Sequence, residues 1–118
     1  MSRMATKKKP TREPPQTWSS EDYRRVTGIA EALSDRTRLR LLVELEERRE
    51  ASVTELVAAL EAPQSTVSRH LAILLRWGLV FAERRGKQVI YSEVPEATEA
   101  IEHLRVQFAP PDRRLVVD

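Results

Sequence analysis

The chain has 118 residues, enough for one compact domain and too few for two, and its 32% charged and 5% aromatic residues favour a helix-rich fold with a well-solvated surface. It contains no cysteine, which excludes disulfides and thiolate metal sites. No apolar run approaches the roughly 18 residues that span a bilayer, so we expect a protein of the cytoplasm without membrane contact. The net charge is only +2, but the charges are unevenly distributed. Basic residues dominate segments 1–15 and 64–91, and acidic residues gather between residues 44 and 61. Such a separation is expected of a protein that turns one face to a polyanion.

The N-terminal segment, residues 1–17, combines three lysines and three prolines with almost no apolar side chains. Such a segment cannot bury enough surface to fold alone, so we expect a disordered basic arm. Two interpretations of this arm stay open: a tail that keeps the protein in solution, or an arm that follows DNA phosphates.

The first two helices are predicted from their caps and their apolar spacing. Ser19 or Ser20 is a good N-cap ahead of an acidic first turn, and apolar residues recur every three or four positions after it. Ser34 or Asp35 then caps a second helix, which carries leucines and a valine on one face and arginines elsewhere. We expect this second helix to end in the charged run at residues 46–50.

Two helices joined by a tight turn are predicted next. Ser52 is an N-cap with Glu55 three residues later as its capping-box partner, which starts the third helix. Pro63 suits the first turn of the fourth helix, where its missing N–H is no loss, and Gly78 ends that helix. Two short helices in this arrangement form the core of a helix-turn-helix.

A hairpin and a last helix complete the pattern. Between Leu79 and Val94, β-branched and aromatic residues flank the basic residues 84–87, which predicts a β-hairpin with a cationic tip. Pro95 then opens a last helix that ends before Pro110.

The predicted fold class is therefore mainly α with a small β-hairpin: a winged helix-turn-helix of about five helices plus a two-stranded antiparallel wing. One domain at residues 18–109 carries it, after the arm at 1–17 and before a tail at 110–118 that the pattern does not place. We do not expect an enzyme, because the sequence offers no nucleophile with a base, no glycine-rich phosphate loop and no carboxylate dyad.

The fourth helix carries the pattern that points to DNA. Helical spacing puts three apolar residues on one stripe: Val67, Leu71 and Leu74. The opposite stripe is polar, small or cationic: Ser65, Arg69, Ala72 and Arg76. A helix that enters the major groove needs short donors near its start and a guanidinium able to bridge guanine O6 and N7. The same stripe also suits a plain solvated helix, but the basic hairpin that follows favours DNA, since its tip would lie beside the backbone or minor groove.

Residues 33–42 (LSDRTRLRLL), residues 64–71 (QSTVSRHL) and the hairpin at 78–91 together resemble the ArsR family of winged-helix repressors. The resemblance covers residues 20–108. It implies a homodimer joined by its first and last helices, which binds operator DNA and is, in most members, released by a metal, a metalloid or another chemical signal. One departure is the turn at residues 61–63, which reads Glu-Ala-Pro where the family usually has a glycine and a cap serine, so we expect a strained or reshaped backbone there.

The stripe and the resemblance together define the candidate DNA-binding residues. They lie on the fourth helix and at the tip of the hairpin: Gln64, Ser65, Thr66, Ser68, Arg69, His70, Arg76, Arg84, Arg85 and Lys87. A DNA-binding regulator, by its resemblance a homodimeric repressor, is the leading interpretation. The alternative is a winged helix that contacts another protein and binds no specific DNA.

No effector or cofactor is assigned by the sequence. Thiolate-sensing members of the family carry two cysteines where this chain has Ser52 and Thr54, so arsenic, cadmium or lead would not bind tightly by that route. The ligand pairs that zinc- and nickel-type members carry at the ends of the last helix are missing as well. One minor alternative is a divalent metal held between two subunits by Glu99, Glu102 and His103, although a surface histidine on an acidic helix is the simpler interpretation.

Overall fold

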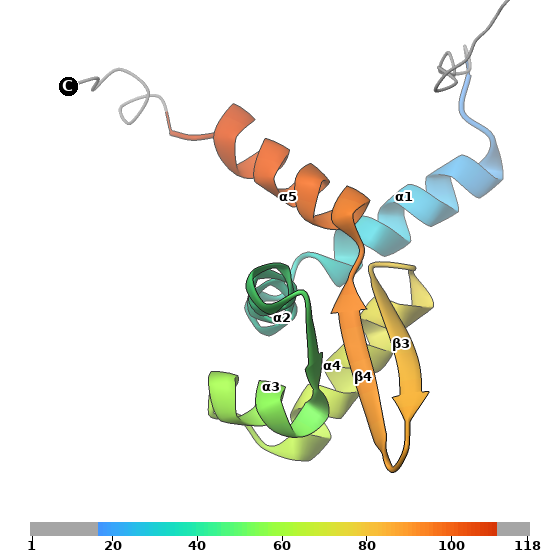
Figure 1. Ribbon diagram of the computed structural model, residues 1–118. Helices are drawn as coiled ribbons and strands as arrows, with labels where there is room; N and C mark the ends of the chain where they lie inside the picture. Colours follow the sequence, from blue (N-terminus) through green and yellow to red (C-terminus); the bar gives the residue numbers. More distant parts are fainter. Residues whose placement is uncertain (1–16, 111–118) are drawn as a thin grey trace, which may run out of the picture.

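The computed structural model describes residues 17–110, so the expected arm, apart from its last residue, and the tail beyond residue 110 lie outside the described residues (Figure 1). Five helices and three strands follow one another in this part of the chain: α1 (Ser20–Ala32), α2 (Arg36–Arg48), β2 (Glu50–Ser52), α3 (Val53–Leu60), α4 (Gln64–Arg76), β3 (Val80–Arg85), β4 (Gln88–Glu93) and α5 (Pro95–Gln107). None of these helices is both long and apolar enough to cross a bilayer.

The caps predicted for the first two helices are confirmed. Ser19 caps α1 in a capping box: its hydroxyl accepts a hydrogen bond from the Asp22 N–H, and the Asp22 carboxylate accepts one from the Ser19 N–H. Asp35 caps α2, where its carboxylate accepts a hydrogen bond from the Arg38 N–H at 3.1 Å. The break between the two helices therefore follows from local hydrogen bonding.

The helix-turn-helix turns sharply at residues 61–63. α3 begins with the predicted capping box of Ser52 and Glu55, and it ends at Glu61, which has a φ of +53°. A side chain in this left-handed region costs roughly 1–2 kcal/mol, so the strain expected from the missing glycine is present. Pro63 occupies the N-cap of α4 rather than its first turn, one position earlier than the sequence suggested.

The predicted hairpin is present, and a third strand joins it. β3 and β4 pair antiparallel up to a turn at Gly86, which has a φ of +63°. β2 adds to the other edge of β4, with Ala51 opposite Tyr91, so the two-stranded wing is part of a three-stranded sheet with the order β2-β4-β3. Arg49, with a φ of +75°, turns the chain from α2 into β2, and its carbonyl accepts a hydrogen bond from the Glu93 N–H.

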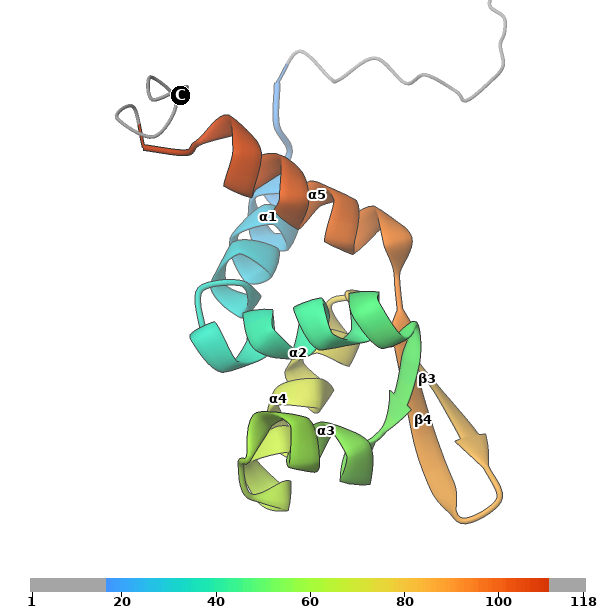
Figure 2. The ribbon, with the colours of Figure 1, turned by 60° about the vertical axis from the view of Figure 1, so that its left-hand side comes forward.

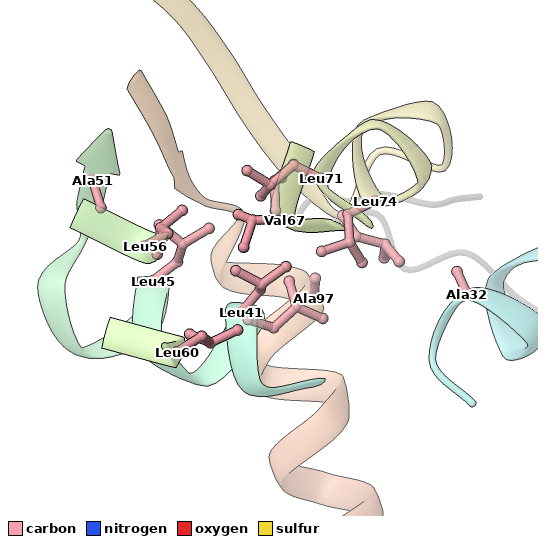
Figure 3. Packing of buried hydrophobic residues seen from close by; sticks show 13 residues of the cluster. Ala32, Leu41, Leu45, Ala51, Leu56, Leu60, Val67, Leu71, Leu74 and Ala97 are labelled. Atoms are coloured by element: carbon pink, nitrogen blue, oxygen red, sulfur yellow. The ribbon is translucent and has the colours of Figure 1, made fainter. Parts of the chain in front are cut away.

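The hydrophobic core lies between α2, α3, α4 and the base of the sheet (Figure 3). Its largest fully buried side chains are Leu41, Leu42, Leu45, Leu56, Val67, Leu71, Leu74 and Val80. The two remaining helices contribute little: α1 buries only Gly28 and Ala32, and α5 only Ala97. In both ribbon views α1 and α5 lie at one end of the molecule, and the wing tip and the α3–α4 turn lie at the other (Figures 1 and 2).

Candidate nucleic-acid interface

α4 turns one face into the core and the other to solvent, as its spacing predicts. The apolar stripe has no exposed surface: Val67, Leu71 and Leu74. The opposite stripe is exposed: Ser65, Arg69, Ala72 and Arg76. Because three buried side chains anchor the helix, packing alone sets the direction in which the polar stripe points.

The start of α4 offers backbone donors as well as side chains. Gln64, its first residue, is exposed, and no side chain caps the helix, because Pro63 stands at the N-cap. The first-turn N–H groups of a helix have no partner within it, and they lie at the positive end of its dipole. This end of α4 is therefore suited to a phosphate group.

The other α4 residues predicted to contact DNA differ in exposure. Thr66 and Ser68 are half-buried on the flanks of the exposed stripe. His70 is buried at 9% exposure, and its Nδ1 atom accepts a hydrogen bond from the Arg38 guanidinium at 3.1 Å. The prediction of a DNA contact for His70 is therefore corrected: its ring packs inside the protein against α2.

The cations of the wing differ in whether they form ion pairs. Arg84 and Lys87, near the tip, are exposed. Arg85 instead donates to both carboxylate oxygens of Glu50, each at 2.9 Å, and to Glu83 at 3.0 Å. These bonds raise the pKa of Arg85 and lower that of Glu50, so Arg85, although about half exposed, is part of an ion-pair network within the wing.

Four candidate cations remain available on α4 and the wing. They form no ion pair with any of residues 17–110: Arg69, Arg76, Arg84 and Lys87. Unpaired exposed cations keep their full field, which attracts a polyanion over a Debye length of about 8 Å at physiological salt.

The opposite end of the molecule exposes large apolar side chains beside arginines that are paired with acids of their own helix. On α1 and just before it these are Trp18, Tyr23 and Val26, which are 45–60% exposed. On and just after α5 they are Leu104, Val106 and Phe108, which are 50–76% exposed. Part of each helix faces the core, where Ala32 and Ala97 are buried and Ile29 and Ile101 pack beside them. The six large side chains named above are left exposed by the described chain.

The residues considered for metals are not gathered into a site. Among the described residues of the single chain, no three His, Asp or Glu side chains come together in a way that would hold an ion. Glu102 forms an ion pair with Arg105 on its own helix. Ser52 uses its hydroxyl as the cap of α3, and Thr54 is exposed beside it.

Comparison with known proteins shows which family has this helix-turn-helix. Residues 35–81, the helix-turn-helix and the start of the wing, match the family described as bacterial regulatory protein, arsR family. An uncharacterized HTH-type transcriptional regulator of Methanocaldococcus jannaschii is 35% identical over 81 residues, which are 69% of this chain and 91% of that protein. The chain belongs to the ArsR family.

Other similar proteins agree in sequence and in fold. The arsenical resistance operon repressor of Escherichia coli is 41% identical over 63 residues, 53% of this chain and 54% of that one. Reduced HlyU from Vibrio cholerae superposes with a TM-score of 0.63 at 32% identity, covering 76% of this chain and 95% of that one. For the repressor BigR from Xylella fastidiosa the TM-score is 0.64 at 30% identity, covering 76% and 92%. This ArsR-family chain is a DNA-binding transcription regulator and not an enzyme, which favours the DNA interpretation over the protein-contact alternative.

Proposed function

We propose that this protein is a homodimeric repressor that binds a pseudo-palindromic operator through α4 and the wing. The observation that carries the proposal is the exposed face of α4. It combines short polar side chains with arginines that have no ionic partner among the described residues, on a helix whose other face is anchored in the core. A cationic face of this kind suits the major groove between two rows of phosphates.

Each exposed residue of α4 has a role that follows from its position. Arg69, in the middle of the stripe, bridges O6 and N7 of a guanine, and Gln64 pairs with an adenine at the helix start. Ser65 donates to a base edge or a phosphate near the same end. Thr66 and Ser68, on the flanks, donate to the phosphates on either side of the groove.

The wing extends the contact along the backbone. Arg84 and Lys87 reach the adjacent phosphates or the minor groove, and Arg76 contacts the backbone at the far end of α4. Arg85 stays with Glu50 and steadies the hairpin. These contacts supply affinity, whereas the base contacts of α4 supply specificity.

The dimer forms through α1 and α5. Their exposed apolar side chains would stay in water in a monomer, and a second copy of the chain covers them across a two-fold axis. A two-fold axis at this end, away from the wing tip, presents both α4 helices to one side of a duplex. Half-sites then lie about 10 base pairs apart or at a multiple of that distance.

Operator binding needs no cofactor in this proposal, and the inducer is a signal that does not depend on thiolates. A chelator should therefore leave DNA affinity unchanged. If added Zn²⁺ altered the affinity instead, Glu99, Glu102 and His103 would be the ligands to substitute first. The regulator acts in the cytoplasm, where its operator is.

The test is selection of DNA by the full-length protein from a randomised duplex pool, followed by sedimentation of the protein with and without the selected duplex. We expect an inverted repeat to be enriched, one dimer to bind each duplex, and the selected site to be bound at least about 10³-fold more tightly than random DNA. Equal binding of selected and random duplexes, or one monomer per site, would contradict the proposal.

A further inference from the structure

His70 joins α4 to the end of α1 through one arginine. The Arg38 guanidinium donates from Nη1 to His70 Nδ1 at 3.1 Å, from Nε to the Ala32 carbonyl at 2.6 Å and from Nη2 to the Glu31 carbonyl at 3.2 Å. The two carbonyls belong to the last turn of α1, where helix carbonyls lack a partner within the helix. Because arginine only donates, the imidazole is the acceptor of this hydrogen bond, through Nδ1.

A second contact joins the same two helices at a different place. A Cβ atom built on Gly28 would lie 2.1 Å from Cη2 and 2.2 Å from Cζ2 of Trp77, so the backbone of α1 rests directly on the indole ring. Glycine is a poor helix former, and its use in the interior of α1 is explained by this close approach. Trp77 is the C-cap of α4.

The two contacts are separated along both helices. His70 and Trp77 stand seven residues apart, about 10 Å along α4, while Gly28 and Ala32 are one turn apart on α1. One contact would leave a helix free to swing about it, whereas two separated contacts fix both its position and its angle. α1 buries no residue other than Gly28 and Ala32, and Ile29 and Leu33 are only partly buried where they pack against the core, so α1 has few other contacts that could fix its angle to α4.

We propose that the Arg38–His70 and Gly28–Trp77 contacts form a brace that makes α1 and α4 one rigid unit and thereby sets the distance between the two reading helices of the dimer. The inference rests on the proposed function, since it requires dimerisation through α1 and an operator with two half-sites. The four residues are positioning residues and do not touch DNA. A change at the dimer interface would reach α4 through this brace, because α1 belongs to both.

The test uses three duplexes: the inverted repeat selected by the wild-type protein, the same repeat with one or two base pairs inserted between the half-sites, and a single half-site. Each inserted base pair moves one half-site by about 3.4 Å and rotates it, so a rigid dimer binds less tightly with every insertion. We expect wild-type protein to prefer the original spacing strongly. His70→Leu, which keeps the volume but has no acceptor, should lose about tenfold or more of that preference and bind the single half-site as the wild type does.

Three further variants and one control separate positioning from a general loss of structure. His70→Asn places an acceptor close to the Nδ1 position and should recover the spacing preference. Gly28→Ala, whose methyl group pushes α1 off Trp77, should lose it as His70→Leu does. Arg38→Met removes the donor of all three hydrogen bonds and should lose the preference as well. Arg40→Met is its matched control and should keep the preference, because Arg40 lies on the same helix, is exposed and forms no ion pair with the residues described.

The outcomes distinguish the two proposals. If the wild-type protein prefers one spacing and His70→Leu keeps that preference, the brace is overturned while the proposed function stands. If His70→Leu loses single-site affinity as strongly as full-site affinity and His70→Asn does not restore it, His70 serves α4 alone, and the brace is again overturned. If the wild-type protein itself ignores the spacing, the proposed dimeric function fails, and the brace fails with it.

Discussion

The two ends of the molecule differ in which charged side chains are paired and which apolar side chains are exposed. On α1 and α5, arginines pair with acids of their own helix, such as Arg24 with Glu21 and Arg105 with Glu102, while large apolar side chains stay exposed. On α4 the stripe of Val67, Leu71 and Leu74 is buried, although Leu75 is 42% exposed, and Arg69 has no ion pair with the described residues. Free charge suits a polyanion and uncovered apolar surface suits a second copy, so the contrast indicates a different partner for each end.

The largest expected effect compares two leucines, one from each region. Leu71→Ala removes a side chain with no exposed surface and should lower the free energy of unfolding by about 2–5 kcal/mol. Leu104→Ala, at 50% exposure, should change monomer stability by less than about 0.5 kcal/mol. Urea unfolding at low protein concentration measures both. If Leu104→Ala were as costly in the monomer, the apolar face of α5 would be part of the core rather than an interface.

The next largest effect concerns operator binding. Arg69→Ala should weaken binding to the selected operator by about 1–3 kcal/mol per half-site, because alanine cannot form the two hydrogen bonds to guanine. Arg24→Ala removes the same charge from α1, where Glu21 already pairs with it, and should leave the affinity nearly unchanged. Fluorescence anisotropy at one fixed salt concentration compares the two variants. Equal losses would mean that net charge, and not the position of α4, controls binding.

A smaller effect is expected at the junction of the two regions, where Asp35 caps α2. The hydrogen bond from the Arg38 N–H lowers the pKa of Asp35, so the carboxylate stabilises the fold above its ordinary pKa of about 3.9, and this stability is lost as the pH falls through the lowered value. Asp35→Ala should cost about 1 kcal/mol at pH 7. Thermal unfolding from pH 7 to pH 2 should show the difference from wild type shrinking in acid. If the difference in stability between Asp35→Ala and wild type stayed constant from pH 7 to pH 2, the charge of the Asp35 carboxylate would not be the source of the stabilisation.

The smallest effect is expected at the wing. Arg84→Ala should weaken binding to specific and random duplexes by similar factors and reduce the salt slope by about 0.9 for each phosphate that is no longer neutralised. Arg48→Ala, whose charge is paired with Glu44 on α2, is the control and should leave the slope unchanged. A weakening confined to the selected operator would show that Arg84 binds a base.

The secondary structure could be read from the sequence because its signals are local. Ser19, Asp35 and Ser52 cap helices through hydrogen bonds that span three residues, and the period of Val67, Leu71 and Leu74 shows which face of α4 is buried. The hairpin was predicted for the same reason: β-branched and aromatic residues stand on both sides of a short turn. Exposed candidates such as Arg69 followed directly from this spacing.

Other features were decided only by tertiary contacts. β2 has three residues and becomes a strand because β4 lies beside it. The Arg38–His70 and Arg85–Glu50 contacts join residues 32 and 35 positions apart, so no local pattern marked His70 as buried or Arg85 as paired.

What the sequence determined by itself was therefore the order of the five helices and the hairpin, the caps of the first three helices, the inward face of α4 and the family. Which arginines stay free and how α1 is held against α4 depend on distances that exist only after the chain folds. Helical and strand periods repeat over a few residues and assign a side chain to a face, but they carry no information about which distant side chain meets it there.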